Sequence, residues 1–417
     1  MFRKRPILSR MGVIVLPLML GLLAGQGCES PPASSAVVFE GARLIVGDGS
    51  PPIENAAFVV DGGRLVEVGP AAELDGWAGA KRVDLAGMTV MPAIIDTHTH
   101  LNQERDALIQ DLRARARYGV SAAMSLGRDT RDLSIRAEEI PGAARFRSAG
   151  VGITSPEPGR SEIPYWVSTE DEARQAVRDE AARKVDIIKI WVDDRNGQYE
   201  KLSPELYGAI IDEAHQHGIP VTAHIFALAD TKQLLRAGID AFAHGVRDTD
   251  VDEEIIGLFK ERPDVVLVPN LPNRGVAADL SWLGGTISPD ELEGLQAASV
   301  DDPDAQAVFG IQARNLARLS AEGVTIALGT DGNTPWAPHV EMEDMVAAGM
   351  TPAQVIVAAT RNSADLLGLD DAGTLEAGKR ADFLVLNANP LDDITNTRQL
   401  VSVYLNGEEV DRSAAEQ

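Results

Sequence analysis

One stretch of the sequence decides the fold that we expect: Val90-Met91-Pro92-Ala93-Ile94-Ile95-Asp96-Thr97-His98-Thr99-His100. It is an apolar run that ends in two histidines one residue apart. Alternate side chains of an extended strand face the same way, so both imidazoles project together from the end of this strand. Two neutral imidazoles that converge in this way suit a divalent transition metal, most often zinc. So short a motif is equally compatible with a strand that ends in two solvent-facing histidines.

Other residues of metal-binding type follow further apolar runs. They are Lys189 within 186–191, His224 at the end of 221–224, His244 at the end of 241–244, and Asp331 after 324–330. An unpaired ammonium inside an apolar strand would be costly. Helical patterns at 204–217 and 230–237 lie between the runs, and alternating strands and helices predict a parallel sheet. Polar residues at the carboxyl ends of such strands are typical of the active site of a (β/α)8 barrel.

These residues carry a family resemblance. From about 37 to 410 the chain resembles the amidohydrolase superfamily, in particular its secreted, imidazolonepropionase-related and prolidase-like members. The resemblance implies two divalent metal ions, expected to be Zn²⁺. His98, His100 and Asp331 would hold one ion, and His224 and His244 would hold the other. A Lys189 side chain carboxylated by CO2 would bridge them.

This arrangement implies a hydrolytic chemistry. A water between two divalent ions has a lowered pKa and provides hydroxide at neutral pH. Asp331 can accept the proton as hydroxide attacks a carbonyl, and can return it to the leaving amine. We therefore expect Asp331 to act both as a ligand and as the catalytic base.

The expected fold class is α/β, a TIM barrel with a small discontinuous β-sandwich. A chain of 417 residues, 44% hydrophobic, is long enough for both parts. Both flanks alternate apolar and polar residues between turns, and they bracket the barrel. The resemblance places them, 36–90 and 373–417, in one β-sandwich around a barrel over 91–372. We expect the barrel strands near 92–97, 120–126, 146–153, 186–192, 219–225, 239–244, 265–270 and 324–330.

Residues for substrate contact are harder to identify. Seven side chains fall on the loops that we expect at the catalytic face: Arg128, Tyr165, Trp166, Arg247, Asn270, Arg274 and Trp336. An arginine there could pair with a substrate carboxylate. We select Arg128, Arg247 and Trp336, together with His339 from the loop that follows Asp331. The long segment 271–307 is a candidate lid.

Four further polar residues have structural explanations. His215 and His217 lie in the last turn of a helix closed by glycine, where imidazoles are at home. Glu341 and Glu343 lie near the start of the next predicted helix, where carboxylates favour the helix dipole.

The N-terminus is a targeting segment. Four basic residues precede the apolar run 11–24, and Cys28, the only cysteine of the chain, follows it. A sole cysteine after such a segment resembles the lipidation site of a bacterial lipoprotein. We therefore expect residues 1–28 to direct export and Cys28 to carry a lipid that anchors the protein to a membrane of the cell envelope. Simple cleavage of the signal, or its retention as an anchor, are the alternatives.

The net charge of the chain limits the binding partners that we expect. The chain has 38 basic and 63 acidic residues, giving a net charge of −25. This excludes a surface that binds polyanions, so no nucleic-acid partner is expected. The expected partners are a small amide or peptide substrate and the membrane surface, and a homo-oligomer is a further option.

Three functions remain open. The first is a metal-dependent amidohydrolase that cleaves the C–N bond of a dipeptide or an N-acyl amino acid through metal-bound hydroxide. The second is a cyclic-amide hydrolase of the imidazolonepropionase type. The third is a catalytically silent binding protein of the envelope. Metal content separates them: about two ions per chain favours the first, one the second, and none the third.

Overall fold

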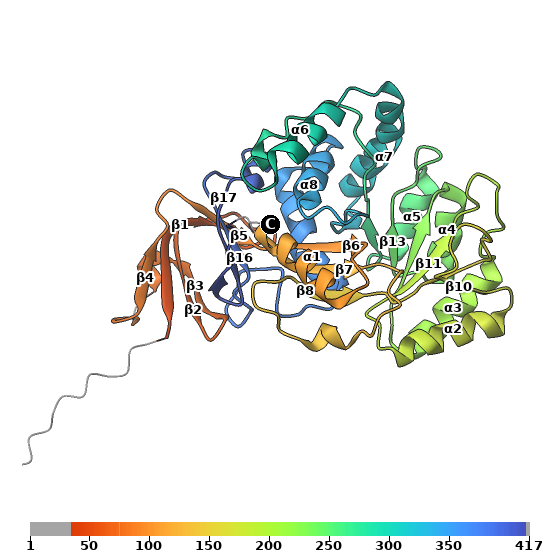
Figure 1. Ribbon diagram of the computed structural model, residues 1–417, viewed down its shortest axis with the longest axis horizontal. Coiled ribbons are helices and arrows are strands. Elements are labelled where there is room, and N and C mark those ends of the chain that lie inside the picture. The colour runs from red at the N-terminus through yellow and green to blue at the C-terminus, as the bar shows by residue number, and fades with distance from the viewer. Residues whose placement is uncertain (1–34, 75, 414–417) are drawn as a thin grey trace, which may run out of the picture.

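The computed structural model describes residues 35–74 and 76–413, whose strands form three hydrogen-bonded sheets with helices packed around them (Figure 1). The predicted export segment and Cys28 lie outside these described residues. Within the described part, no helix is both long and apolar enough to cross a membrane.

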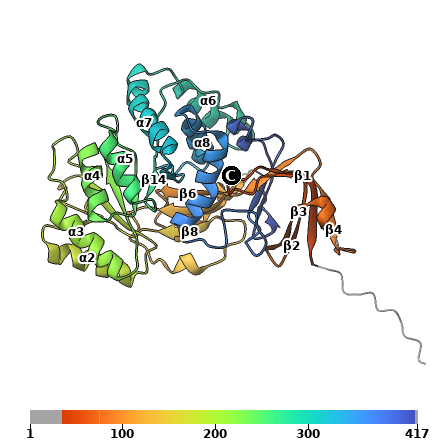
Figure 2. The same cartoon turned by 180° about the vertical axis from the view of Figure 1, so that it is seen from behind.

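Strands from both ends of the described chain form one eight-stranded sheet. They are β1 (Val37–Leu44), β2 (Ile53–Asp61), β3 (Arg64–Pro70), β4 (Lys81–Asp84), β5 (Thr89–Pro92), β16 (Phe383–Leu386), β17 (Leu400–Leu405) and β18 (Glu408–Glu409). β16 pairs antiparallel with β5 and β17, so the last strands lie beside the first ones (Figures 1 and 2). The predicted strands of both flanks therefore lie in one sheet. Their assignment to a separate β-sandwich domain stays a prediction.

The remaining strands are parallel to their neighbours. Seven form one sheet in the order β10 (Tyr165–Trp166), β9 (Ile153–Thr154), β11 (Ile188–Val192), β12 (Val221–Ile225), β13 (Ala241–Ala243), β14 (Val266–Val268) and β15 (Thr325–Ile326). Three form another, in the order β6 (Ile94–Thr99), β7 (Val120–Ser125) and β8 (Arg145–Ser148). Most of their residues are buried, as parallel strands covered by helices require.

The pairing of the described strands does not close into the single barrel that we expected. Backbone hydrogen bonds link the two parallel sheets at both junctions, from Asp186 N to Ser148 O (2.9 Å) and from Thr97 N to Leu328 O (2.9 Å). The predicted strand 146–153 divides into β8 and β9 because Gly150 and Gly152 turn the chain at φ values of 64° and 79°. The predicted strand 324–330 keeps only its first half in the ladder, as β15. The fold is α/β and resembles a TIM barrel without a continuous ladder.

Ten α-helices of the described chain connect and cover these strands: α1 (Arg105–Arg117), α2 (Glu170–Ala182), α3 (Pro204–Gln216), α4 (Leu228–Ala237), α5 (Glu253–Glu261), α6 (Pro289–Ala298), α7 (Pro303–Ala321), α8 (Ala337–Ala347), α9 (Pro352–Val357) and α10 (Ser363–Leu366). Local sequence sets their ends. The Ser203 side chain caps α3, which has Pro204 in its first turn, and Gly238 at φ 100° ends α4. The segment 271–307 is largely ordered by α6 and the start of α7.

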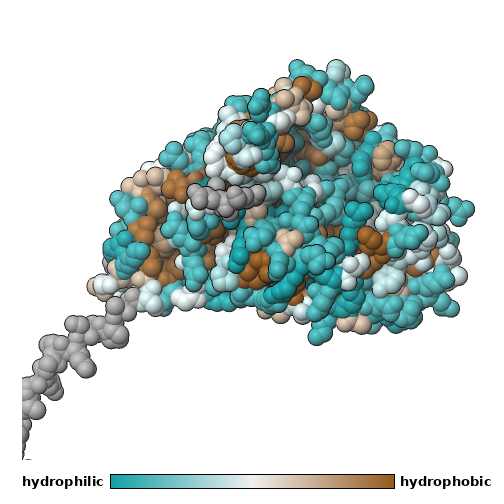
Figure 3. All heavy atoms as spheres, in the orientation of Figure 1, coloured by the Kyte–Doolittle hydropathy of each residue, from teal (hydrophilic) through white to brown (hydrophobic). Residues whose placement is uncertain are grey.

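The surface is mainly hydrophilic, as the high content of charged residues in the sequence leads us to expect. The face in Figure 3 is mostly hydrophilic, with scattered hydrophobic patches. Among the described residues, the exposed large apolar side chains include Val276, Val300 and Val308, which lie in or next to the 271–307 segment.

Candidate metal centre

The carboxyl end of β6 brings His98 and His100 to Asp331. The Nε2 atoms of His98 and His100 lie 3.1 and 2.9 Å from the same carboxylate oxygen, Oδ1 of Asp331. Candidate ligand atoms of these three residues all lie within 4.8 Å of one another. Two imidazoles and a carboxylate that converge in this way form a donor set for a divalent metal.

Backbone contacts hold Asp331 in place. Its backbone N–H and that of Thr330 both donate to His98 O, at 2.7 and 3.0 Å. Asp331 itself has a φ of 53°, in the left-handed region. A Cβ at Gly329 would lie 2.6 Å from Val268 and 2.8 Å from His98, so the turn needs glycine there. The sequence Gly329-Thr330-Asp331 is therefore shaped to deliver the carboxylate to the histidines.

Asn270, after β14, orients His98. Its Oδ1 lies 2.9 Å from His98 Nδ1, and it also accepts from the backbone N–H of His244 at 3.3 Å. A proton on Nδ1 that is donated to Asn270 leaves Nε2 of His98 free to bind a metal. Asn270 has a φ of 44°, which asparagine tolerates better than most residues. The sequence placed Asn270 on a catalytic-face loop but gave no sign of this contact.

His224 and His244 come from neighbouring strands and lie side by side. β12 and β13 pair so that His224 is opposite Ala243, and the two imidazole rings are 4.5 Å apart. Nε2 of His244 lies 3.5 Å from Oδ2 of Asp331. Burial lowers the pKa of His224 to about 3 and that of His244 well below its usual value. Both rings are therefore neutral at neutral pH, as metal ligands must be.

Lys189 is buried, and its amine lies over the Trp191 ring, whose centroid is 5.6 Å from Nζ. Its side chain is 1% exposed, and its Nζ has no hydrogen-bond partner among the described residues. Burial lowers the pKa of this amine to about 7, although the charge of Asp331 opposes the shift. A Cβ at Gly127 would lie 2.8 Å from Lys189 Cγ, so glycine makes room for the side chain. A buried amine that loses its proton easily and has no hydrogen-bond partner among the described residues fits a lysine that takes up a carboxylate group.

The Asp331 carboxyl group is ionised at neutral pH. Burial alone would raise the pKa of its carboxyl group, but His98, His100 and His244 together hold that pKa well below its usual value. Asp96 lies behind it, where it accepts a hydrogen bond from Thr330 Oγ1 at 2.8 Å. Burial raises the pKa of Asp96 to about 6.

The two arginines predicted to contact substrate lie in different surroundings. Arg247 lies at the cluster: its guanidinium donates to Ile225 O at 2.7 Å and stacks over the Phe226 ring at 5.6 Å. Arg128 is exposed immediately after Gly127 and makes none of the contacts described for the cluster.

The prediction that His339 touches substrate is not supported. His339 is 1% exposed, and its ring nitrogens lie 3.0 Å from Thr397 Oγ1 and 2.9 Å from Tyr118 O. The loop after Asp331 turns inward there and packs against the C-terminal segment. Burial lowers the pKa of His339 to about 4.

Other polar groups have structural roles. His215 pairs with Asp240 at 2.8 Å on the surface. Glu341 is buried and accepts from the backbone N–H of Leu271 at 3.0 Å, and burial raises its pKa well above the usual value. Since α8 begins at Ala337, Glu341 binds the start of the 271–307 segment rather than the helix dipole.

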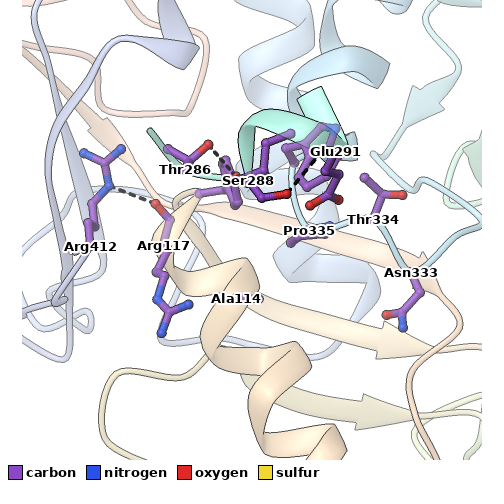
Figure 4. Close-up of a pocket in the computed structure, with 12 residues that line it drawn as sticks. Ala114, Arg117, Thr286, Ser288, Glu291, Asn333, Thr334, Pro335 and Arg412 are labelled. Carbon is purple, nitrogen blue, oxygen red and sulfur yellow. Dashed lines mark hydrogen bonds between the residues drawn. The ribbon is translucent and has the colours of Figure 1, made fainter. Parts of the chain in front are cut away.

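A cavity of about 790 Å³ is lined by the end of α1, by residues 286–288 and 333–336, and by Arg412, and none of the six predicted ligands lines it (Figure 4). Trp336 lines it together with Tyr118, whose ring is 5.7 Å away. Arg412 donates from Nε to Arg117 O at 2.9 Å. Trp336 thus lies at this cavity, which the six predicted ligands do not line.

Comparisons with known proteins agree with this geometry. The model of the amidohydrolase family matches residues 89–410. An imidazolonepropionase of Paracoccus denitrificans is 27% identical over 382 residues, covering 80% of this chain and 88% of the relative. An ochratoxinase of Aspergillus niger is 27% identical over 425 residues, covering 87% and 83%. The structure of a candidate prolidase from Bifidobacterium longum superposes with a TM-score of 0.75 at 30% identity, covering 93% of this chain and 97% of that one.

Proposed function

Because this chain belongs to the amidohydrolase family and is a hydrolase that acts on carbon–nitrogen bonds, we propose that it cleaves the amide bond of a dipeptide or an N-acyl amino acid. The observation that carries this proposal is the buried Lys189 amine, which has no hydrogen-bond partner among the described residues, together with the convergence of His98, His100 and Asp331. The amidohydrolase family is metal-dependent, and the convergence of His98, His100 and Asp331 provides a possible metal site here.

In this proposal the site would hold two divalent ions, proposed to be Zn²⁺. His98, His100 and Asp331 would hold one ion, His224 and His244 would hold the second, and a carboxylated Lys189 would serve both. When bound, the ions acidify water and polarise a carbonyl group. The negative carboxylate on Lys189 would offset part of the repulsion between the two cations.

The chain's own residues supply the proton transfer. An Asp331 oxygen takes a proton from the attacking water and gives it to the nitrogen of the leaving amine, so the amide C–N bond breaks as the new C–O bond forms. Because its pKa is held low, the carboxylate is present as a base at neutral pH. Nε2 of His100 lies 2.9 Å from Oδ1 of that carboxylate and donates to it, which fixes its direction.

Two guanidinium groups favour a substrate that carries a carboxylate. Nη1 of Arg195 and Nη2 of Arg247 lie 3.1 and 3.3 Å from Nε2 of His224. Nη2 of Arg195 and Nε of Arg247 are buried and have no partner among the described residues. Arginines pair strongly with carboxylates, so a free carboxylate of an amino-acid product could take these donors. Phe226, 37% exposed beside Arg247, offers apolar surface to the same substrate.

A substrate series tests this proposal. Protein loaded with zinc in the presence of bicarbonate is assayed with N-acyl amino acids and dipeptides, with the same compounds bearing a C-terminal carboxamide, and with a cyclic amide. We expect the free carboxylates to react at least about 10-fold faster than the carboxamides, the value of a lost charge-assisted contact. Arg247→Met should remove that preference. Equal rates for acids and carboxamides would contradict the recognition proposed here.

The cyclic-amide hydrolase remains a second candidate, because imidazolonepropionases are among the similar relatives. Turnover of the cyclic amide alone would favour it. No turnover of any compound by fully metal-loaded protein would favour the silent binding protein, against which the complete donor set argues.

For location, we propose export and attachment of a lipid to Cys28. This proposal rests on the basic start, the short apolar run and the single cysteine of the sequence. It would hold the catalytic region at a membrane surface of the cell envelope.

A further inference from the structure

A short turn follows β11 and places a second acidic side chain against a metal-binding histidine. The turn is Asp193-Asp194-Arg195-Asn196-Gly197, and Oδ2 of Asp193 lies 3.0 Å from Nε2 of His224. β11 and β12 pair with Val192 opposite Ile225, which brings the start of the turn level with the end of β12.

We propose that Asp193 is the positioning residue of His224. It holds the proton on Nε2, so that the other ring nitrogen, Nδ1, presents its lone pair to a metal ion. The inference rests on the metal site proposed above but not on the identity of the substrate.

The direction of the contact follows from the donors around Nε2. The Arg195 and Arg247 guanidinium groups also approach this nitrogen, but each has a shorter contact with another acceptor. Nη1 of Arg195 donates to Oδ2 of Asp193 at 2.6 Å, and Nη2 of Arg247 donates to Ile225 O at 2.7 Å. A carboxylate can only accept, so the imidazole is the donor in its contact with Asp193. The Nε2–H form of His224 is the one that leaves Nδ1 free.

The surroundings hold Asp193 in place. Its Oδ1 accepts from the backbone N–H of Arg195 at 2.9 Å, while the Arg195 side chain binds Oδ2. Nε of Arg195 in turn donates to Oε1 of Glu157 at 3.1 Å, and Glu157 is 2% exposed. A chain of charge-assisted hydrogen bonds therefore runs from Glu157 through Arg195 and Asp193 to His224.

The backbone of this turn adopts an unfavourable conformation. Arg195 and Asn196 have φ values of 53° and 61°, a conformation that non-glycine residues adopt only at a cost. That geometry folds the turn back so that Arg195 reaches Asp193 with both its backbone and its side chain. The neighbouring acid, Asp194, instead accepts from the backbone N–H of Gly197 at 3.0 Å through Oδ1, and its Oδ2 lies 3.4 Å from Nζ of Lys201.

The first readout is the protonation of the ring and needs no metal. The metal-free protein is labelled with ¹⁵N-histidine, and the His224 signal is identified by its absence in a His224→Gln variant. We expect the Nε2–H form in wild type, with Nδ1 unprotonated. In Asp193→Ala we expect a mixture of both forms. An Nδ1–H ring in wild type, or an unchanged ring in Asp193→Ala, would overturn the proposal.

The second readout is metal affinity. Loss of such an outer partner typically costs about 10- to 100-fold in affinity. We expect Asp193→Ala to lose that much affinity for one of the two zinc ions, and to keep the affinity of the other. Asp194→Asn, which removes the neighbouring charge but keeps the acceptor for the Gly197 N–H, is the matched control and should bind both ions as wild type does. Should Asp193→Ala fail to fold, Asp193→Asn keeps the shape and an acceptor, and should show an intermediate loss. Affinities equal to wild type in both Asp193 variants would refute the role.

Failure of this proposal and failure of the proposed function are distinguishable. A wild type that hydrolyses no amide but has the Nε2–H form of His224 refutes only the function. A wild type that hydrolyses N-acyl amino acids with an Nδ1–H form of His224 refutes only the role of Asp193.

Discussion

Oδ1 of Asn270 lies 2.9 Å from Nδ1 of His98 and 3.3 Å from the backbone nitrogen of His244. One side chain thus joins the ends of two strands that each carry a candidate ligand. Because a histidine binds metal through only one nitrogen at a time, the acceptor on Nδ1 decides which nitrogen of His98 faces the ion.

We therefore expect Asn270→Gly to weaken metal binding at the His98 site by about 10- to 100-fold. Glycine tolerates the φ of 44°, so the loss would come from the missing acceptor rather than from backbone strain. Titration of the metal-free protein with zinc in competition with a chelator measures this loss of affinity. Asn270→Asp keeps the acceptor and should bind nearly as wild type. A change in Asn273, on the same loop, should have no effect.

Lys189→Ala should remove the second metal ion and nearly all hydrolysis. The variant lacks the amine that carries the proposed carboxylate, and short carboxylic acids such as formate should restore part of the activity by occupying its place. Metal analysis and turnover with and without formate measure both effects. Lys201→Ala, which changes a lysine paired with Asp230 at 2.8 Å, is the control and should match wild type. Full metal content and turnover in Lys189→Ala would exclude a bridging lysine.

Asp331→Asn should keep the fold and lower kcat by about 10²- to 10⁴-fold or more, the usual contribution of a general base. Asparagine can still contact the histidines but can neither take the proton nor neutralise the ion. Steady-state kinetics at saturating metal measure the loss, with the exposed Asp365→Asn as a control. Near wild-type turnover in Asp331→Asn would mean that another group moves the proton.

His339 should make the protein sensitive to acid. Its pKa is lowered to about 4 in the folded chain, whereas in the unfolded chain it is near 6.5. The unfolded state therefore takes up a proton first, so the free energy of unfolding falls as the pH drops from about 6.5 towards 4. At pH 5 the loss from this residue is about 2 kcal/mol relative to pH 7.

Replacing His339 by glutamine should reduce the loss in free energy of unfolding between pH 7 and pH 5. Denaturant unfolding at pH 7 and pH 5, in the presence of a chelator, measures the difference for wild type and variant. The exposed Gln110→Ala, which changes no titratable group, is the control and should leave the pH dependence unchanged. An identical loss of stability in wild type and His339→Gln would show that His339 does not contribute.

Cys28→Ser should release the protein from membranes. Wild type should pellet with the membrane fraction, because several acyl chains on one cysteine give stable anchoring, whereas the variant should stay in the soluble fraction. Cell fractionation, followed by detection of the protein in the membrane and soluble fractions, measures this distribution. The same distribution for both proteins would refute lipid attachment at Cys28.

The sequence could predict the candidate ligands because they follow apolar strands. The carboxyl ends of parallel strands meet at one edge, and that rule suffices to bring His98, His244 and Asp331 together. It could not predict the contacts that orient the ligands. Asn270 and Asp193 act through turns with unusual backbone angles, and nothing in the pattern of apolar residues marks such turns.

Two other differences have equally physical causes. The continuous barrel was predicted from strand patterns, but Gly150 and Gly152 break one strand where the pattern looks unbroken. His339 follows Asp331 closely in the sequence, so it was expected at the substrate. Its contact with Thr397, far along the chain, turns it inward instead, and such distant contacts leave no local signal.

The pairing of β16 with β5 also governs the order in which this protein can fold. β5 leads directly into β6 and its histidines, yet its partner strand comes from the last part of the chain, with Phe383 opposite Pro92. Closing a loop of that length has a high entropic cost and slows folding. The strand that carries the first metal ligands therefore lacks one neighbour until synthesis is nearly complete. A newly made chain would stay incompletely folded for that time, which is the state in which secretion machinery that threads extended polypeptides could accept it.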